Sequence, residues 1–493
     1  MKRAYFVQGA ATAALLLGSS VALAQQDGQA DGATQEEMLE QEGGVLGGLM
    51  PGSTERIGAG TAFNPSISVI LDGVYKNTFS GDAHDPGGFE GGHDHGHGHG
   101  HGHGMEDGFQ LRETEFAFEA SVDPYFDAFA MLVIEGTDRV DLEEAYFTTT
   151  SLPGGLQIKG GRFLSDIGYI NSQHPHEWDF VDRPLVNEHL FGNHGIQETG
   201  VQLNWLLPTQ TYLKGGVEVL QGTTSGIAAY EGESDVRPEW VQPDGAGNPV
   251  RERTDRQHLP FDDASGPRLF TGFLKWGPDL GYDHAAQFGI SGGYARSFQR
   301  MEGHSQGLRV DTWDGDAWFA GLDAVYKYSS GGYLGQGDLT VQGEYFYRNI
   351  DLDYDYFDHE GESEWVRNPD GTVGGTSGRF QQDGAYLQAV YGIAPRWRAG
   401  VRAEALGIAK NTAWADREDG PDNGYFDFDT SYRYSVNATF YPSHFSYLRA
   451  QVNYADFAGG FDDETVSSES REDEWSFMLQ YNLSLGAHGA HPF

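Results

Sequence analysis

The sequence predicts an all-β fold, a transmembrane antiparallel β-barrel of about 16 strands with short periplasmic turns and long outer loops. Apolar and polar residues alternate with a period of two in many segments, short turns alternate with long polar loops, and the chain begins like an exported protein. In lipid, a barrel needs apolar side chains outside and polar side chains around a water-filled lumen, and this alternation provides both.

The N-terminus has the features of a secretory signal peptide. Lys2 and Arg3 precede a short apolar run that ends in small residues at Ala22–Ala24. We expect residues 1–24 to be removed near Ala24 after Sec-type export. Residues 25–61 are polar and glycine-rich, which predicts a flexible periplasmic leader, and 62–493 would form the barrel in a Gram-negative outer membrane.

Two-residue periodicity identifies the strands. In the last of them, Trp475, Phe477 and Leu479 alternate with polar residues such as Ser476 and Gln480. Sixteen is an even number, which places both chain ends on the periplasmic side and leaves an aqueous channel. The expected strands lie near 66–76, 110–122, 126–134, 140–150, 156–164, 199–207, 211–221, 269–276, 285–296, 317–328, 338–349, 380–392, 396–406, 430–440, 446–456 and 474–485.

The connections alternate between short turns and long loops, which is the pattern of membrane barrels. The short turns include 123–125, 152–155 and 442–444. Expected outer connections are 77–108, the short 135–139, 165–197, 222–268, 298–316, 351–379, 408–428 and 457–473.

Composition excludes several classes of function. The 493 residues carry a formal net charge of −42 and no cysteine. The charge argues against nucleic acid as a partner and favours either cations as partners or a salty habitat, and the lack of thiols rules out disulfides and thiolate metal sites. Catalytic motifs such as G-x-S-x-G or H-E-x-x-H do not occur, so we do not expect an enzyme.

A histidine-rich tract lies between the first two expected strands. His93, His95, His97, His99, His101 and His103 alternate with glycine or aspartate, and His84 lies nearby. Alternate residues of an extended chain share a face, and neutral imidazole is a ligand for zinc, copper and nickel. The tract therefore predicts metal capture in the first outer loop, 77–108, with a solvated spacer as the alternative.

The third outer loop, 165–197, contains a second candidate metal site. Two imidazoles and two carboxylates lie within six residues, a mixed set of nitrogen and oxygen ligands that suits zinc. Since imidazole has an ordinary pKa of about 6.5, bound metal should leave between roughly pH 7 and pH 5.5. A purely structural loop is the alternative. The candidate ligands are His174, His176, Glu177, Asp179, His189 and His194.

Charged residues at alternate positions of the expected strands would line the pore. They are Glu113, Glu115, Glu119, Asp323, Glu344, Arg348, Arg398, Arg402, Glu404, Arg433 and Arg449. Acidic and basic groups on opposed walls would set ion selectivity, while pairing across the wall is the alternative.

Three stretches resemble a proteobacterial family described as zinc-regulated outer-membrane receptors. They are "FNPSISVILDGVY" at 63–75, "LEEAYFTTTSLPGGLQIKGGRF" at 142–163 and "NSQHPHEWDFVDRPLVNEHLFGNHGIQETGVQLNWLLP" at 171–208. The chain is more distantly similar to phosphate-selective porins, which share the "EAY…GRF" hairpin. The first resemblance implies zinc uptake coupled to TonB, and the second implies anion uptake.

These observations together predict a porin-like channel for divalent metal, most of all zinc, whose outer histidines concentrate the ion. The alternatives are an energy-coupled, TonB-dependent zinc receptor, an anion or phosphate-type porin, and a closed metal-binding barrel. No resident cofactor is expected, because zinc or another divalent transition metal would be ligand or substrate. Expected partners are outer-membrane lipid, lipopolysaccharide and the barrel-assembly machinery; a homotrimer and a contact with TonB stay open.

Overall fold

The computed structural model describes most of the chain from Gly60 onward. The described residues are 60–61, 65–81, 83, 85–89, 105–136, 139–231, 235–236, 239–243, 249–253, 257–258, 264–304, 309–358, 376–415, 424–462 and 465–486. The expected signal peptide, nearly all of the leader, His84 and the histidine-rich tract lie outside these residues.

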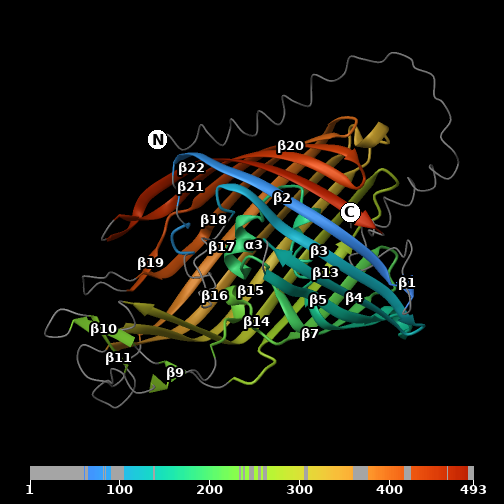
Figure 1. The fold of residues 1–493 in the computed structure, drawn as a ribbon. Helices are drawn as coiled ribbons and strands as arrows, with labels where there is room; N and C mark the ends of the chain where they lie inside the picture. Colours follow the sequence, from blue (N-terminus) through green and yellow to red (C-terminus); the bar gives the residue numbers. More distant parts are fainter. Residues whose placement is uncertain are drawn as a thin grey trace. The chain divides into compact units, whose positions relative to one another are not determined.

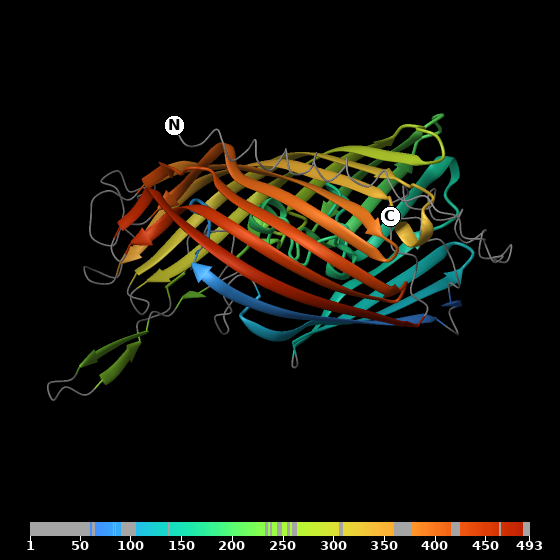
Figure 2. The ribbon, with the colours of Figure 1, turned by 90° about the horizontal axis from the view of Figure 1, so that it is seen from above.

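Sixteen strands of the described chain form one closed antiparallel barrel (Figure 1). Each strand pairs with the next along the chain, and the first pairs with the last, from Ser68 opposite Gly486 to Gly81 opposite Glu474. Figure 2 shows the sheet curving around on itself. The expected strand number and closure are confirmed. The barrel strands are β2 (Ser66–Gly81), β3 (Gly108–Asp123), β4 (Phe126–Glu135), β5 (Arg139–Thr149), β6 (Leu156–Leu164), β7 (Gln197–Leu206), β8 (Tyr212–Leu220), β13 (Leu269–Gly277), β14 (His284–His304), β15 (Arg309–Tyr328), β16 (Leu339–Asp358), β17 (Thr376–Ala394), β18 (Trp397–Ala415), β20 (Ser431–Ser443), β21 (Ser446–Asp462) and β22 (Thr465–Gly486).

The alternation along each strand separates an apolar outer surface from a polar interior. On β7, Val201, Leu203 and Trp205 are 42–52% exposed, whereas Gln202 and Asn204 between them are at most 4% exposed. A surface of exposed apolar side chains on every side of a closed sheet is what a bilayer requires. Within the described residues no helix is long and apolar enough to span a membrane.

Several segments expected to be outer loops are in fact strand. The barrel strands β14 to β18 and β21 to β22 continue well into the expected loops 298–316, 351–379, 408–428 and 457–473. There the inward face is still buried, with Trp313, Leu352 and Tyr354 at most 6% exposed, but the outward face meets water instead of lipid. The period-two pattern that a bilayer imposes is therefore lost while the backbone ladder continues. The loop boundaries drawn from the sequence were therefore wrong, although the alternation of short turns and long connections is confirmed.

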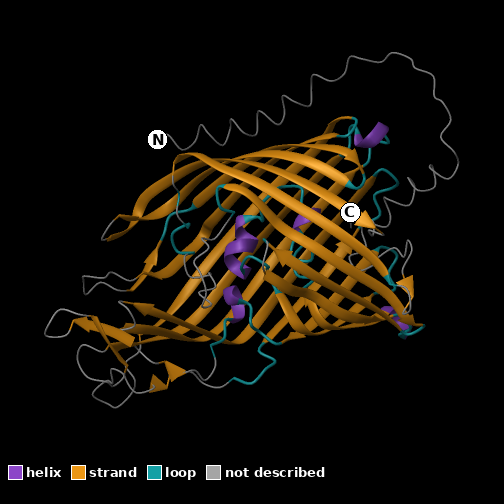
Figure 3. Cartoon of the chain, viewed as in Figure 1, coloured by secondary structure: helices purple, strands orange, loops and turns teal. Residues whose placement is uncertain are grey.

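The remaining elements are short. β1 (Gly60–Thr61) pairs in parallel with β3, so the expected leader ends in a strand. β19 (Gly424–Asp427) pairs with β18, and β9 (Asp235–Val236), β10 (Glu239–Pro243), β11 (Pro249–Arg253) and β12 (Gln257–His258) form two small hairpin-like sheets within 222–268. Figure 3 shows how little of the chain is helical. The helices are η2 (Pro153–Gly155), η3 (Pro175–Glu177), α3 (Leu185–Phe191), α4 (Ser225–Ala228) and η5 (Tyr333–Gly335).

Candidate functional site

The connection between β6 and β7 folds into the barrel. We call residues 165–196 the inner loop; it contains η3 and α3, and α3 appears inside the ring of strands in Figure 1. Its apolar side chains, including Ile167, Val186, Leu190 and Phe191, are completely buried against inward-facing side chains of the wall such as Phe346. The third outer loop of the sequence-based prediction is therefore an internal structure that fills part of the lumen.

Glutamate side chains of the wall accept hydrogen bonds from the backbone of the inner loop. The Asp166 amide donates to Glu218 at 3.1 Å, the Tyr169 amide to Glu344 at 2.5 Å and the Leu185 amide to Glu404 at 2.7 Å. These three acceptors come from β8, β16 and β18, so the loop is held from several directions. A carboxylate that accepts backbone N–H bonds makes a strong, charge-assisted contact.

Gly168 makes one of these contacts possible. Its φ of 57° lies in the left-handed region, and a Cβ at this position would lie 2.2 Å from the Glu344 carboxylate oxygen. Any other residue would both strain the backbone and displace the carboxylate that receives the Tyr169 amide.

The predicted pore-lining residues point inward, but the inner loop covers most of them. Glu115, Arg348, Arg402, Glu404 and Arg449 are at most 3% exposed. Glu344 is equally buried, Asp323 is 5% and Glu113 8% exposed, and only Glu119, Arg398 and Arg433 are partly exposed. Several of these wall charges, among them Glu344 and Glu404, hold the inner loop.

On one side of the lumen the loop presents histidines to acidic residues of the wall. The His174 ring lies 3.4 Å from Glu143 and 3.2 Å from Glu144 of β5, and His176 Nδ1 lies 2.8 Å from Glu115 of β3. The two imidazoles stack with their centroids 5.9 Å apart. We call these five residues the histidine–carboxylate cluster. The three glutamates lie far from the histidines in sequence, and no sequence pattern would pair them.

The other predicted metal ligands do not converge on this cluster. The Glu177 carboxylate accepts the His174 amide at 2.9 Å, and the Asp179 carbonyl accepts a hydrogen bond from Asn437. His189 packs on Phe89 and His194 lies 3.8 Å from Glu135. In the described part of the chain, no three His, Asp or Glu side chains are placed to hold one metal ion together.

Elsewhere around the lumen, on β18 and β20 and on β6, β8 and β13, the polarity is reversed, because the loop presents carboxylates to basic residues of the wall. We call these positions together the basic side. Asp182 lies 2.6 Å from Arg402 and 3.1 Å from Arg433, while Glu404 of the wall bonds both arginines at 3.0 and 2.7 Å. Asp166 pairs with Lys214 at 2.8 Å.

Three lysines of this basic side were missed from the sequence. Lys159, Lys214 and Lys275 occupy inward positions of β6, β8 and β13 and surround Asp166. They lie within segments correctly expected to be strands, at positions that alternate with outward apolar residues. Applying the alternation to these strands would have found them.

The charged residues of the wall shift the pKa values of charged groups in the inner loop. Burial lowers the pKa of His174, but the carboxylates of Glu143 and Glu144 outweigh it, so this pKa lies well above the ordinary 6.5. Burial raises the pKa of Asp166 and of Asp182, but the neighbouring lysines and arginines hold both values below the ordinary range. The expected release of metal from His174 between pH 7 and pH 5.5 assumed an unshifted imidazole, and the raised pKa moves that range upward.

The described residues on either side of the histidine-rich tract both contact the inner loop or its supports. Phe89 is fully buried, with its ring 6.0 Å from that of His189 in α3. The Gly87 carbonyl accepts a hydrogen bond from Asn411 at 2.9 Å. Met105 packs on a cluster that includes Val181 of the inner loop. The described residues that flank the tract on both sides are thus placed at the inner loop or at its contacts.

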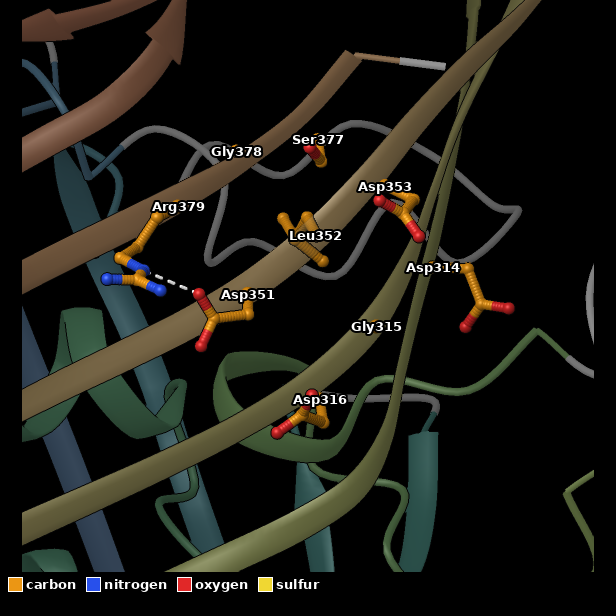
Figure 4. Close-up of a pocket in the computed structure, with 9 residues that line it drawn as sticks. All are labelled: Asp314, Gly315, Asp316, Asp351, Leu352, Asp353, Ser377, Gly378 and Arg379. Carbon is orange, nitrogen blue, oxygen red and sulfur yellow. Dashed lines mark hydrogen bonds and ion pairs between the residues drawn. The ribbon is translucent and has the colours of Figure 1, made fainter. Parts of the chain in front are cut away.

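A pocket lies on the outward face of the barrel wall, where β15, β16 and β17 continue into the segments expected to be loops. Its volume is about 510 Å³, and Asp314, Asp316, Asp351 and Asp353 line it together with Arg379 (Figure 4). Asp316 alternates with buried Ala317 and shares its face with Trp318, which is 40% exposed, so the pocket opens outward. Arg379 pairs with Asp351 at 2.5 Å. This acidic pocket is separate from the lumen.

Comparison with known proteins gives one relative in sequence and several in fold. No family model matches the chain. A protein of Aquifex aeolicus (strain VF5), described as an uncharacterized protein, is 33% identical over 443 residues, which cover 88% of this chain and 80% of that protein.

The similar solved structures are outer-membrane proteins. The channel DcaP of Acinetobacter baumannii has a TM-score of 0.46 at 11% identity, covering 87% of this chain and 100% of that one. OmpT of Vibrio cholerae, in its trimer form, has a TM-score of 0.44 at 9% identity, covering 85% of this chain and 99% of that one. OprB of Pseudomonas putida has a TM-score of 0.42 at 11% identity, covering 86% and 94%. At these scores the likeness concerns the barrel fold alone.

Proposed function

We propose that this chain, which belongs to the same family as the Aquifex aeolicus protein, is a porin-like outer-membrane channel that admits divalent metal, zinc above all. The histidine-rich tract concentrates the ion at the loop end of the barrel. The ion then passes the histidine–carboxylate cluster on its way through the lumen. The barrel with its polar interior supports the channel; the metal specificity is the step that needs testing.

The observation that carries this proposal is the placement of the tract's two described flanks. Phe89 packs on His189, and Met105 packs on the apolar cluster that contains Val181. Metal captured by the tract between these two flanks would therefore be close to the inner loop. A histidine-rich segment fixed at the loop that narrows the lumen can deliver metal to it at a raised local concentration.

The chemistry of the cluster supports the second step. His174, His176, Glu115, Glu143 and Glu144 offer imidazole nitrogen and carboxylate oxygen, which are the ligands zinc prefers where thiolates are absent. His174 Nδ1 and Glu143 Oε2 face each other at 3.4 Å, and Glu115 Oε2 is buried without a hydrogen bond among the described residues. They do not converge on one point, so a metal ion here would exchange quickly between pairs of ligands, as passage through a channel requires.

Zinc block of the channel tests the proposal. Detergent-folded protein is inserted into planar bilayers, and the sodium current is measured while zinc is added on the loop side. We expect millimolar zinc to reduce the current, and His174→Ala with His176→Ala to raise the half-blocking concentration. His444→Ala is the matched control, because His444 is an exposed histidine in the turn between β20 and β21.

Deletion of Gly92–Gly104 separates the two steps. Loops tolerate a change of length at small entropic cost, so the barrel should still fold. Calorimetric titration with zinc should lose most of its sites, while the intrinsic block persists at higher zinc. A current that zinc leaves unchanged in the wild-type protein would contradict metal passage, and reversal potentials that favour anions would support the anion porin instead.

A further inference from the structure

Two buried lysines of the basic side face each other on neighbouring strands of the wall. Lys214 of β8 and Lys275 of β13 are direct cross-strand partners, and their Nζ atoms lie 5.5 and 5.7 Å from the centre of the Phe273 ring between them. Like charges opposite each other on neighbouring strands destabilise a sheet unless something compensates them. Asp166 compensates Lys214, at 2.8 Å.

The nearest other carboxylate of β8 is already occupied. Glu218 accepts hydrogen bonds from Ser165 Oγ, the Asp166 amide, Gln202 Nε2 and Thr271 Oγ1. With its oxygens committed to these four donors, it is not an acceptor for Lys275.

Lys275 is left without an acceptor in a fully buried position. The residue is 0% exposed, and its Nζ makes no hydrogen bond with any described residue. Gln287 of the adjacent β14 is 1% exposed, and its Nε2 also lacks an acceptor among the described residues. Burying an ammonium group without a partner is costly, so two such donors on neighbouring strands indicate that an acceptor belongs there.

A buried acceptor without a donor lies on the next strand. Asp323 of β15 is 5% exposed, and neither of its carboxylate oxygens makes a hydrogen bond within the described structure. Gly289 lies between Lys275 and Asp323 in the ladder. The Asp323 carboxylate leans over this glycine, since a Cβ on Gly289 would lie 2.0 Å from its oxygen. The missing side chain of Gly289 therefore lets the carboxylate approach the Lys275 side, although the two form no ion pair.

The geometry points to a binding site for a small anion that also carries a hydroxyl group, between Lys275 and Gln287 on one side and Asp323 on the other. The anionic oxygens would accept from Lys275 Nζ and Gln287 Nε2, and the hydroxyl would donate to the Asp323 carboxylate. Lys214 and Lys159 add positive charge, partly offset by Asp166. An anion without a hydroxyl leaves Asp323 unsatisfied and faces its repulsion. A hydroxycarboxylate and a protonated phosphate share the required chemistry.

This inference goes beyond the proposed metal channel and does not depend on it, since it can be tested without conduction. Saturation-transfer NMR of the full-length, detergent-folded protein compares glycolate with acetate, which differ by one hydroxyl. Phosphorus NMR line width follows inorganic phosphate, and sulfate, which has no proton at neutral pH, serves as competitor. We expect glycolate to bind more tightly than acetate, or phosphate to resist competition by sulfate. A preference for glycolate identifies a hydroxycarboxylate as the ligand class, and a preference for phosphate over sulfate identifies inorganic phosphate.

Two variants assign the effect to the site. Lys275→Gln should weaken binding of the preferred anion about tenfold to a hundredfold, as expected for one lost charge-assisted hydrogen bond. Asp323→Ala should abolish the preference for the hydroxylated anion while binding of the plain anion persists or improves. Lys159→Gln is a milder version at a partly exposed lysine, should Lys275→Gln fail to show the heat-modifiable mobility of a folded barrel.

Lys410→Gln is the matched control, because it removes an exposed lysine outside the lumen. Absence of binding by all four anions overturns the proposal, as does equal binding of glycolate and acetate together with equal binding of phosphate and sulfate. Unchanged affinity in Lys275→Gln and Lys159→Gln would likewise place any bound anion elsewhere.

Discussion

Two sets of wall contacts hold the same loop with opposite polarity. On the acidic side, His174 and His176 of the loop meet glutamates of the wall; on the basic side, Asp166 and Asp182 of the loop meet lysines and arginines of the wall. The difference teaches that the anchors are separable by pH. The pKa of His174 is raised above the ordinary imidazole value of 6.5, whereas the pKa values of Asp166 and Asp182 are lowered below the ordinary carboxylate range.

The basic side should carry the largest share of stability, through Asp182. Asp182→Ala leaves Arg402 and Arg433 with Glu404 as their shared carboxylate, and it removes one of the two acceptors of Gln451 Nε2. Breaking a buried ion pair by deleting one partner costs about 3–5 kcal/mol. We expect a loss of that size in the free energy of unfolding, measured by urea titration in lipid vesicles with tryptophan fluorescence. A loss below about 0.5 kcal/mol, the usual range of surface changes, would mean that the arginines do not hold the loop.

Asp166→Asn should have a smaller effect on the same side. It removes one charge-assisted pair, with Lys214, and the cost of losing such a hydrogen bond is about 1.5–3 kcal/mol. The variant also removes the carboxylate that offsets the three lysines, so glycolate or phosphate should bind more tightly than to the wild-type protein. The same urea titration could show the loss in free energy of unfolding while neither anion binds more tightly. The basic side would then hold the inner loop without binding anions, and it would differ from the acidic side only in the sign of its charge.

The acidic side should respond to pH where the basic side does not. The pKa of His174 in the folded protein lies well above the ordinary 6.5, so its stabilisation is fully present below pH 6.5 and is lost as the pH rises through the folded value. The lowered pKa of Asp166 gives the opposite sign, with stabilisation present above its ordinary value and lost only in acid. Above pH 6.5, stability of the wild-type protein should therefore fall with rising pH, and His174→Gln should flatten this part of the profile. Equal slopes in the two proteins would show that His174 does not anchor the loop.

The smallest effect is expected on the outer face of the wall. Asp316→Asn changes a residue of the acidic outer pocket that touches neither side of the lumen. It should change the free energy of unfolding by less than about 0.5 kcal/mol and leave the zinc block unaltered. A change in the block would show that charge outside the lumen contributes to the apparent selectivity of the interior.

The sequence was informative where the bilayer imposes a pattern. Strand number and closure follow from period-two alternation, and the structure confirms them. Strand length could not be read in the same way, because Asp314 and Asp316 lie on an outward face that meets water instead of lipid and so look like loop residues. The period-two alternation therefore reports whether a strand segment lies in lipid or in water, and it does not report where the strand ends.

The partners of the inner loop were beyond the reach of the sequence. His174 and His176 were recognised as a pair, but Glu144 and Glu115 lie 30 and 61 residues away from their imidazole partners, on two different strands. Only the closed sheet brings them together. The same holds for Lys275 and Gln287, whose lack of acceptors is a property of burial and not of composition.

The seam between β2 and β22 has a consequence for how the barrel is assembled. Gln480 of β22 donates to Asp72 of β2, although the two are 408 residues apart in the chain. The inner loop bonds Arg112 of β3 and Gln451 of β21. β3 is the neighbour of β2 and β21 is the neighbour of β22, so the loop bridges the seam. Its last contacts therefore cannot form until the ends of the chain have met, and the entropic cost of that longest closure falls on the final step. The loop has to lie inside the curved sheet before the seam shuts, so enclosing it and sealing the barrel are one event.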